Sequence, residues 1–143
     1  MKRQLLTAIM LSFVVALAVT TVTAQSGSHL MRITIPFEFT IRDKALPSGE
    51  YIVRRSVSER PETLTISRVD GSSGEYVLTS AVQTNSPRAE SMLVFHSYGE
   101  RYFLTQVWSA GDSAGRELPK TTRERELAKN AVTRQTVTLA ARH

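Results

Sequence analysis

Hydrophobic and polar residues alternate over much of the chain after residue 31, which is the pattern of half-buried β-strands. The clearest run covers residues 32–41, where isoleucines and phenylalanines occupy every second position. Pro36 lies on the polar side of this run and has no backbone N–H, so we expect an edge strand or a bulge there. Residues 135–140 alternate in the same way and predict the last strand.

Further strands are expected between these two runs, each bounded by residues that favour turns. They cover residues 50–55, 63–69, 75–83, 92–98 and 101–108. Residues 42–49 and 109–118 are dominated by turn-forming, small or polar residues, so we interpret them as a turn and a loop.

Residues 92–108 are apolar and aromatic on both sides of Gly99 and Glu100, which predicts a tight β-hairpin. If Tyr98 opposes Arg101, alternation assigns the side chains to two faces. One face carries Leu93, Phe95, Tyr102, Leu104 and Trp108, and the other carries Met92, Val94, His96, Tyr98, Phe103 and Val107. Both faces are largely apolar, which predicts strands covered on two sides or a strongly curved sheet.

A short helix is expected near the C-terminus. Thr121 can cap the first turn of this helix, and Glu124 stands at the acidic position of a capping box. The helix covers residues 122–130 and has few apolar residues, so we expect it on the surface. Together the segments predict an all-β fold, an antiparallel β-sandwich or barrel of about six to seven strands with one short C-terminal helix.

Residues 1–24 have the order of a secretory signal peptide. Lys2 and Arg3 form a positive start, an apolar stretch follows, and Val22 and Ala24 stand at the positions that a signal peptidase reads. We expect cleavage after Ala24 and a secreted or periplasmic protein. An uncleaved membrane anchor is the alternative, because the apolar stretch approaches the length that spans a bilayer. After cleavage no stable membrane span is expected.

Cleavage leaves residues 25–31 as a flexible lead-in and residues 32–141 as a single β-domain. Of the 143 residues, none is cysteine, which excludes disulfides, thiolate metal sites and a cysteine nucleophile. Removal of residues 1–24 lowers the formal net charge from +5 to +3. Seven basic but only three acidic residues follow Gly115, so the positive charge belongs to the C-terminal segment.

The sequence contains no coherent catalytic or metal-binding pattern. Residues 111–115 match a Gly-x-Ser-x-Gly string, but that motif requires a following helix and a later histidine within a large α/β sheet. We interpret these residues as a turn. His96 is interpreted as a structural histidine on a sheet face, since the three histidines lack zinc-site spacing. We therefore expect no cofactor, no metal and no catalytic residue.

Three aromatic residues around the hairpin are candidates for binding. Tyr98, Tyr102 and Trp108 could form a stacking platform for a sugar or an apolar partner. The alternative is that these rings pack in the core or in cross-strand pairs.

Three basic residues of the C-terminal segment are the second set of candidates. Arg116, Lys120 and Arg123 would attract an anionic envelope polymer, lipid headgroups or a protein partner. A solvated helix with internal Glu/Arg pairs explains the same charges without any ligand. Nucleic acid is not expected as a partner, because export removes the usual target.

Four segments carry a resemblance to a known family. They are residues 36–39 (PFEF), 46–51 (LPSGEY), 93–104 (LVFHSYGERYFL) and 115–120 (GRELPK). In these segments the chain resembles a family of small secreted bacterial β-proteins that has no assigned activity. The resemblance implies export and a compact β-domain, and it implies no site residue.

We expect an exported, non-catalytic structural or binding protein of the cell envelope. One alternative is a small hydrolase acting on envelope polymers, which requires a cleft with two close carboxylates. Another is a subunit that self-associates by pairing an edge strand, either residues 135–140 or the strand containing Pro36, with a neighbouring molecule.

Overall fold

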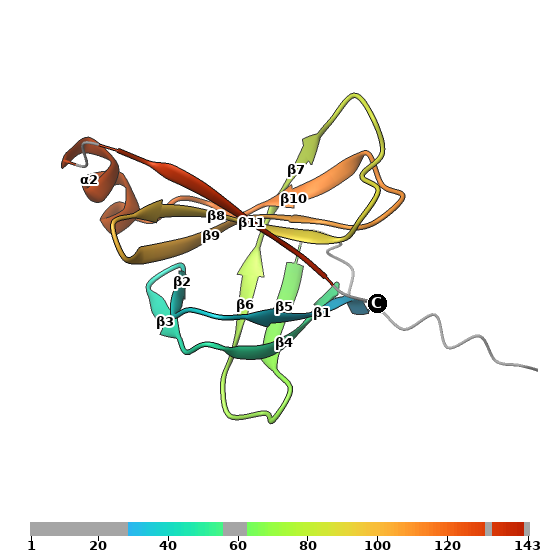
Figure 1. The fold of residues 1–143 in the computed structure, drawn as a ribbon, viewed down its shortest axis with the longest axis horizontal. Coiled ribbons are helices and arrows are strands. Elements are labelled where there is room, and N and C mark those ends of the chain that lie inside the picture. Colours follow the sequence, from blue (N-terminus) through green and yellow to red (C-terminus); the bar gives the residue numbers. More distant parts are fainter. Residues whose placement is uncertain (1–28, 56–62, 131–132, 142–143) are drawn as a thin grey trace, which may run out of the picture.

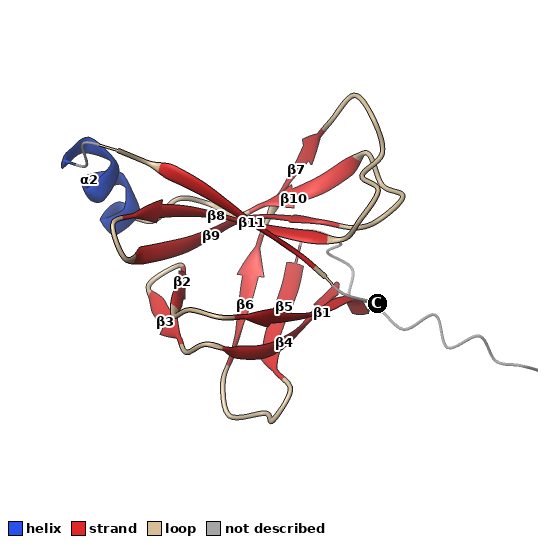
Figure 2. Ribbon diagram, viewed as in Figure 1, coloured by secondary structure: helices blue, strands red, loops and turns tan. Residues whose placement is uncertain are grey.

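A computed structural model describes residues 29–55, 63–130 and 133–141 of the chain. β-strands dominate this part, with one helix near its C-terminal end, which confirms the predicted all-β class (Figure 2). The expected signal peptide, residues 1–24, lies outside the described residues.

The strands form two sheets that pack face to face (Figure 1). The first sheet has the order β1 (His29–Ile35), β4 (Gly49–Arg55), β5 (Thr63–Arg68) and β6 (Gly74–Leu78). The second sheet has the order β11 (Gln135–Ala140), β8 (Met92–Tyr98), β9 (Arg101–Trp108), β10 (Ala114–Glu117) and β7 (Ser80–Gln83). Strand β2 (Phe39–Ile41) pairs in parallel with β9 and antiparallel with β3 (Lys44–Leu46). Helix α2 covers Thr122–Asn130, as predicted.

Two segments predicted as single strands cross from one sheet to the other. The run at residues 32–41 divides at Pro36 into β1 and β2, and the run at 75–83 divides at Thr79 into β6 and β7. Strands that bend from one sheet into the next form the corners of orthogonal sandwiches. The described chain therefore has eleven strands, more than the six or seven that alternation indicates.

The core lies between the two sheets and contains the inward-facing residues of both. Its largest fully buried side chains are Tyr51, Phe39 and Phe95, and the ring of Phe39 makes edge contacts with both other rings. The Tyr51 hydroxyl donates a 2.6 Å hydrogen bond to the carbonyl oxygen of Pro47. A tyrosine that bonds back to the chain a few residues upstream fixes the corner leading into its strand, as in other β-sandwiches.

The predicted β8–β9 hairpin is confirmed, but only part of its face assignment is right. Tyr98 opposes Arg101, and Gly99 has a φ of 64°, which suits a tight turn. A bulge between Val94 and Phe95 shifts the pairing by one residue beyond that point. As a result Val107 joins the core, whereas Trp108 does not belong to the core cluster.

The prediction of a loop over residues 109–118 is wrong at β10. This strand pairs with both β7 and β9. Gly115 makes the approach feasible, because a Cβ atom there would lie 2.6 Å from the Trp108 ring. The guanidinium of Arg88 lies 4.6 Å from the centre of the same ring. The small and polar residues of this segment therefore form a strand, and that strand requires glycine at position 115 because no side chain fits there.

Two further expectations need correction at the N-terminal half. Strand β1 begins at His29, so the expected flexible lead-in ends earlier than residue 31, and Met31 is buried. The expected turn over residues 42–49 contains the short strand β3. Arg42 adopts a φ of 56° and lets the chain reverse between β2 and β3.

Candidate functional site

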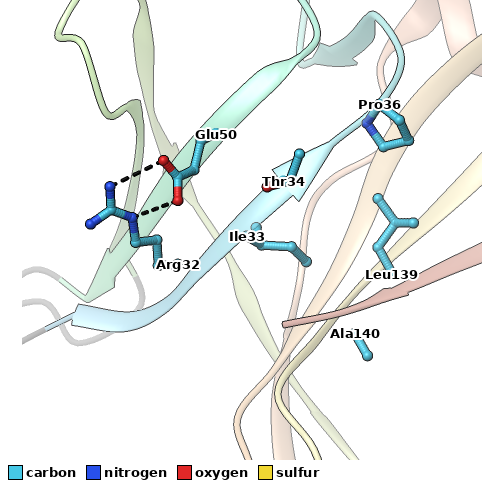
Figure 3. Close-up of a pocket in the computed structure, with 7 residues that line it drawn as sticks. All are labelled: Arg32, Ile33, Thr34, Pro36, Glu50, Leu139 and Ala140. Atoms are coloured by element: carbon cyan, nitrogen blue, oxygen red, sulfur yellow. Dashed lines mark hydrogen bonds and ion pairs between the residues drawn. The ribbon is translucent and has the colours of Figure 1, made fainter. Parts of the chain in front are cut away.

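A groove of about 480 Å³ lies between β1 and β11, one strand from each sheet (Figure 3). It is lined by Arg32, Ile33, Thr34, Pro36, Glu50, Leu139 and Ala140. Figure 3 shows Leu139 of β11 pointing toward Pro36, which follows β1. The groove therefore marks the place where one edge of each sheet meets the other.

Both strands are edge strands within the described part of the chain. There, β1 pairs only with β4, and β11 pairs only with β8. The Cα atoms of β1 and β11 come within 8 Å of one another, and no ladder joins the two strands in the described residues. In Figure 1 the C-terminal end of β11 approaches β1 and the strands diverge from there. The two sheets thus form a seam on this side.

The backbone groups of β11 alternate between the β8 side and the seam. The amide of Ala141 donates to the carbonyl of Ser91, so this pair is hydrogen-bonded. Because bonded and non-bonded pairs alternate in an antiparallel ladder, Leu139 and Val137 also bond to β8. The N–H and C=O groups of the remaining residues point away from β8. These residues are Thr136, Thr138 and Ala140.

The same argument applies to β1. Val69 donates its amide to the carbonyl of Glu50, which directs the backbone of Glu50 toward β5. The next residue, Tyr51, is therefore directed toward β1, where it pairs with Ile33. It follows that Arg32 and Thr34 present their backbone groups to the seam. Two rows of donors and acceptors that no strand of the described residues pairs thus border one groove.

An ion pair forms the polar part of the groove lining. Arg32 Nε and Nη2 donate to the two carboxylate oxygens of Glu50 at 2.7 and 3.0 Å, a bidentate arrangement (Figure 3). The hydrogen bond from Arg32 holds the pKa of Glu50 below its ordinary value, and the carboxylate raises the pKa of Arg32. Both side chains are exposed, so the pair orients charge at the rim and stabilises the fold little.

The apolar part of the groove lining comes from both strands. Ile33 is buried in the core, and half-buried Leu139 packs against that core from β11. Leu139 is therefore an apolar side chain that the fold covers only in part. A groove with an apolar base and a charged rim has the general composition of a binding site.

The structure does not bring the three predicted aromatic residues together on one exposed surface. Tyr98 is 6% exposed and Trp108 2%, and the ring of Tyr98 makes an edge contact with Phe103. Tyr102 lies on the core side of the sheet, where its ring stacks on Phe37 at 3.9 Å. The three rings therefore pack against neighbouring side chains, as in the second of the two arrangements that the sequence left open.

The three predicted basic residues occupy separate positions on the fold. Arg116 is half-buried on β10, whereas Lys120 and Arg123 are exposed before and within α2. Lys120 lines a shallow groove of about 270 Å³ with Ser80, Glu117, Leu118 and Pro119. Neither Arg116 nor Arg123 lines that groove, so the three cations do not share one cavity.

Glu124 anchors α2 through the cap that the sequence predicted and through a second contact that it did not predict. Its amide donates to Thr121 Oγ1 at 3.0 Å, as a helix cap requires. Its carboxylate contacts His96 Nδ1 at 3.3 Å on the outer face of the hairpin and is buried there. Burial raises the pKa of Tyr98, with a smaller contribution from the Glu124 carboxylate. His96 thus has a structural position on a sheet face, in contact with the helix.

Within the described residues, no cluster of three or more histidine and acidic side chains could hold a metal ion. Helix α2, the helix in that part of the chain, is too short and polar to cross a membrane. Comparison with protein-family models, with curated proteins and with solved structures finds no match.

Proposed function

We propose that the protein is exported to the cell envelope and acts there as a non-catalytic binding protein, with the groove between β1 and β11 as its binding site. The signal-peptide pattern of residues 1–24 and the resemblance to small secreted bacterial β-proteins support export. The observation that carries the binding role is the groove itself, in which two sheet edges, left unpaired by the part of the chain that the structure describes, flank a partly covered apolar side chain. Such edges are used for recognition of other chains.

The chemistry of the groove favours binding over the hydrolase alternative. A glycosidase needs a carboxyl group that can donate a proton, beside a second carboxylate. Glu50 is the carboxylate of the groove lining, and both of its oxygens accept hydrogen bonds from Arg32. The lowered pKa of Glu50 keeps it ionised and unsuited to the role of a general acid.

Cell fractionation combined with intact-mass measurement tests the export part of the proposal. The expected product is a chain that begins at Gln25 and is recovered from the envelope or the medium. A full-length chain retained in the cytoplasm would contradict export.

Retention in the envelope fraction tests the binding part. Ala140→Lys places a long cation in the groove lining on β11, whereas Tyr76→Lys introduces the same cation at an exposed residue of the edge strand β6. We expect Ala140→Lys to reduce retention and Tyr76→Lys to leave it unchanged. Equal retention of both variants and the unmodified protein would exclude the groove as the binding site.

A further inference from the structure

We propose that the groove between β1 and β11 binds an extended peptide segment of a partner protein, which adds to β11 as a new edge strand. This inference rests on the proposed binding function and names the class of partner. The main chain of the peptide supplies the hydrogen bonds to β11, and the side chains of the peptide determine which segments bind.

The backbone of β11 offers the hydrogen-bonding groups that an extended peptide requires. Thr136, Thr138 and Ala140 direct N–H and C=O groups away from β8, at every second residue of a regular ladder. Only another extended chain offers acceptors and donors with the matching period. The edge of β1 is less suitable, because its pairing with β4 is irregular near His29 and it ends before Pro36, which has no N–H.

The shape of the seam suits a single extended chain better than the edge of a folded second copy. A strand between two edges requires about two inter-strand spacings, roughly 9.6 Å. The Cα atoms of β1 and β11 are closer than 8 Å at their nearest approach, and the strands diverge away from it. A single peptide can enter from the wide end along β11. The edge of a folded copy comes with further strands beside it, which need more room than a single chain.

The side chains of the groove predict the pattern of the peptide. Along β11, Val137 and Leu139 are half-buried on the core side, whereas Thr136 and Thr138 are exposed. A strand added beside β11 continues this alternation across the sheet. Its inward residues should therefore be apolar and cover Leu139, and its outward residues should be polar.

Amide hydrogen exchange with a synthetic peptide tests the proposal on the whole exported protein. The probe is a peptide in which threonine and valine alternate between lysine ends. We expect a saturating concentration to slow exchange at Thr136 and Thr138 by about tenfold or more, while Val137 and Leu139, already bonded to β8, do not change. A control peptide with two adjacent prolines at its centre lacks the central backbone N–H donors that would pair with β11, and it should give no protection.

A pair of proline variants locates the binding edge. Thr138→Pro removes an amide that points to the seam and leaves the β8 ladder intact. Tyr76→Pro is the matched control, because the Arg68–Ser73 hydrogen bond places the Tyr76 amide on the unpaired edge of β6. We expect Thr138→Pro to weaken peptide binding by about tenfold and Tyr76→Pro to leave it unchanged.

Three outcomes would overturn the inference. One is the absence of protection in the unmodified protein at millimolar peptide, a result that does not depend on how any variant folds. Another is protection of Thr136 and Thr138 before peptide is added, together with a dimer in light scattering, which would assign the edge to a second copy. The third is equal weakening by both proline variants. In each case, envelope retention that is sensitive to Ala140→Lys would still support a binding groove of another kind.

Discussion

On one side of the sandwich, β6 continues through Thr79 into β7, so that a single stretch of chain belongs to both sheets. On the other side, β1 and β11 belong to different sheets and meet without a ladder in the described residues. The first side is joined through the covalent chain and through β10, which connects β7 to β9. On the second side the chain also crosses between the sheets, from β1 past Pro36 into β2, but no strand of the described residues pairs β1 with β11. The comparison shows that edges of the two sheets border a common groove on the β1–β11 side, whereas the edge strands β6 and β7 on the other side are parts of one continuous stretch of chain.

The largest effect on stability is expected on the side where β6 continues into β7. Gly115→Val places side-chain atoms where the Trp108 ring lies, since even a Cβ would be 2.6 Å from it. We expect a loss of about 3 kcal/mol in the free energy of unfolding, because the ring is buried and β10 cannot move without breaking two ladders. Chemical denaturation measures the loss.

Ala114→Val is the matched control, because Ala114 is the exposed neighbour of Gly115 on the same strand. We expect it to change the stability by less than about 0.5 kcal/mol. Equal losses for the two variants would show that the close approach to Trp108 does not hold this side together.

A smaller effect is expected where α2 is anchored beside β11. His96→Phe removes the partner of the buried Glu124 carboxylate and should cost about 2 kcal/mol. The double variant that adds Glu124→Leu should recover most of this loss, since no unpaired charge then remains under the helix. Thermal unfolding of the single and double variants measures the coupling. A double variant no more stable than His96→Phe would contradict this account of the contact.

These positions also show what the sequence could predict. Alternation and turn chemistry predicted the hairpin, α2, β11 and β4, because each depends on residues close together in the chain. The bulge in β8–β9, the strand around Gly115 and the Glu124–His96 contact depend on segments far apart in sequence. Alternation cannot show where a partner strand skips a residue, or which acid becomes buried.

The groove was only partly predictable for the same reason. The sequence indicated the strand with Pro36 and residues 135–140 as candidates for pairing with another molecule. The structure places β1 and β11 at sheet edges, whereas β2, which follows Pro36, pairs with both β3 and β9. The Arg32–Glu50 pair and the meeting of β1 with β11 need the register of β1 against β4 and the packing of two sheets. For the three aromatic residues the sequence left a stacking platform and a packed arrangement open, because exposure cannot be read from residue type.

A moderate effect is expected at the corner that leads into β4, the neighbour of β1. Tyr51→Phe removes the 2.6 Å hydrogen bond to the Pro47 carbonyl and should cost about 1 kcal/mol. The ring stays in place, so near-ultraviolet circular dichroism should report an unchanged core. A stability loss well above about 1 kcal/mol would mean that the corner contributes more to the stability of this side than one hydrogen bond can supply.

The smallest effect is expected at the groove rim. The pKa of Glu50 lies below its ordinary value of about 4.3, so the Arg32–Glu50 contact stabilises the fold fully above that value. The contribution is lost as the pH falls through the lower folded-state pKa. Glu50→Gln should therefore reduce the difference in denaturation midpoint between about pH 6 and about pH 3. An unchanged difference would show that the pair is not maintained in solution.

The central claim is that β11 presents an unpaired edge to the seam, and amide hydrogen exchange of the free protein tests it most directly. The account predicts a strict alternation, with slow exchange at Val137 and Leu139, which bond to β8, and fast exchange at Thr136 and Thr138. Uniform protection of all four amides in a monomeric protein would contradict it, because the edge would then already be paired.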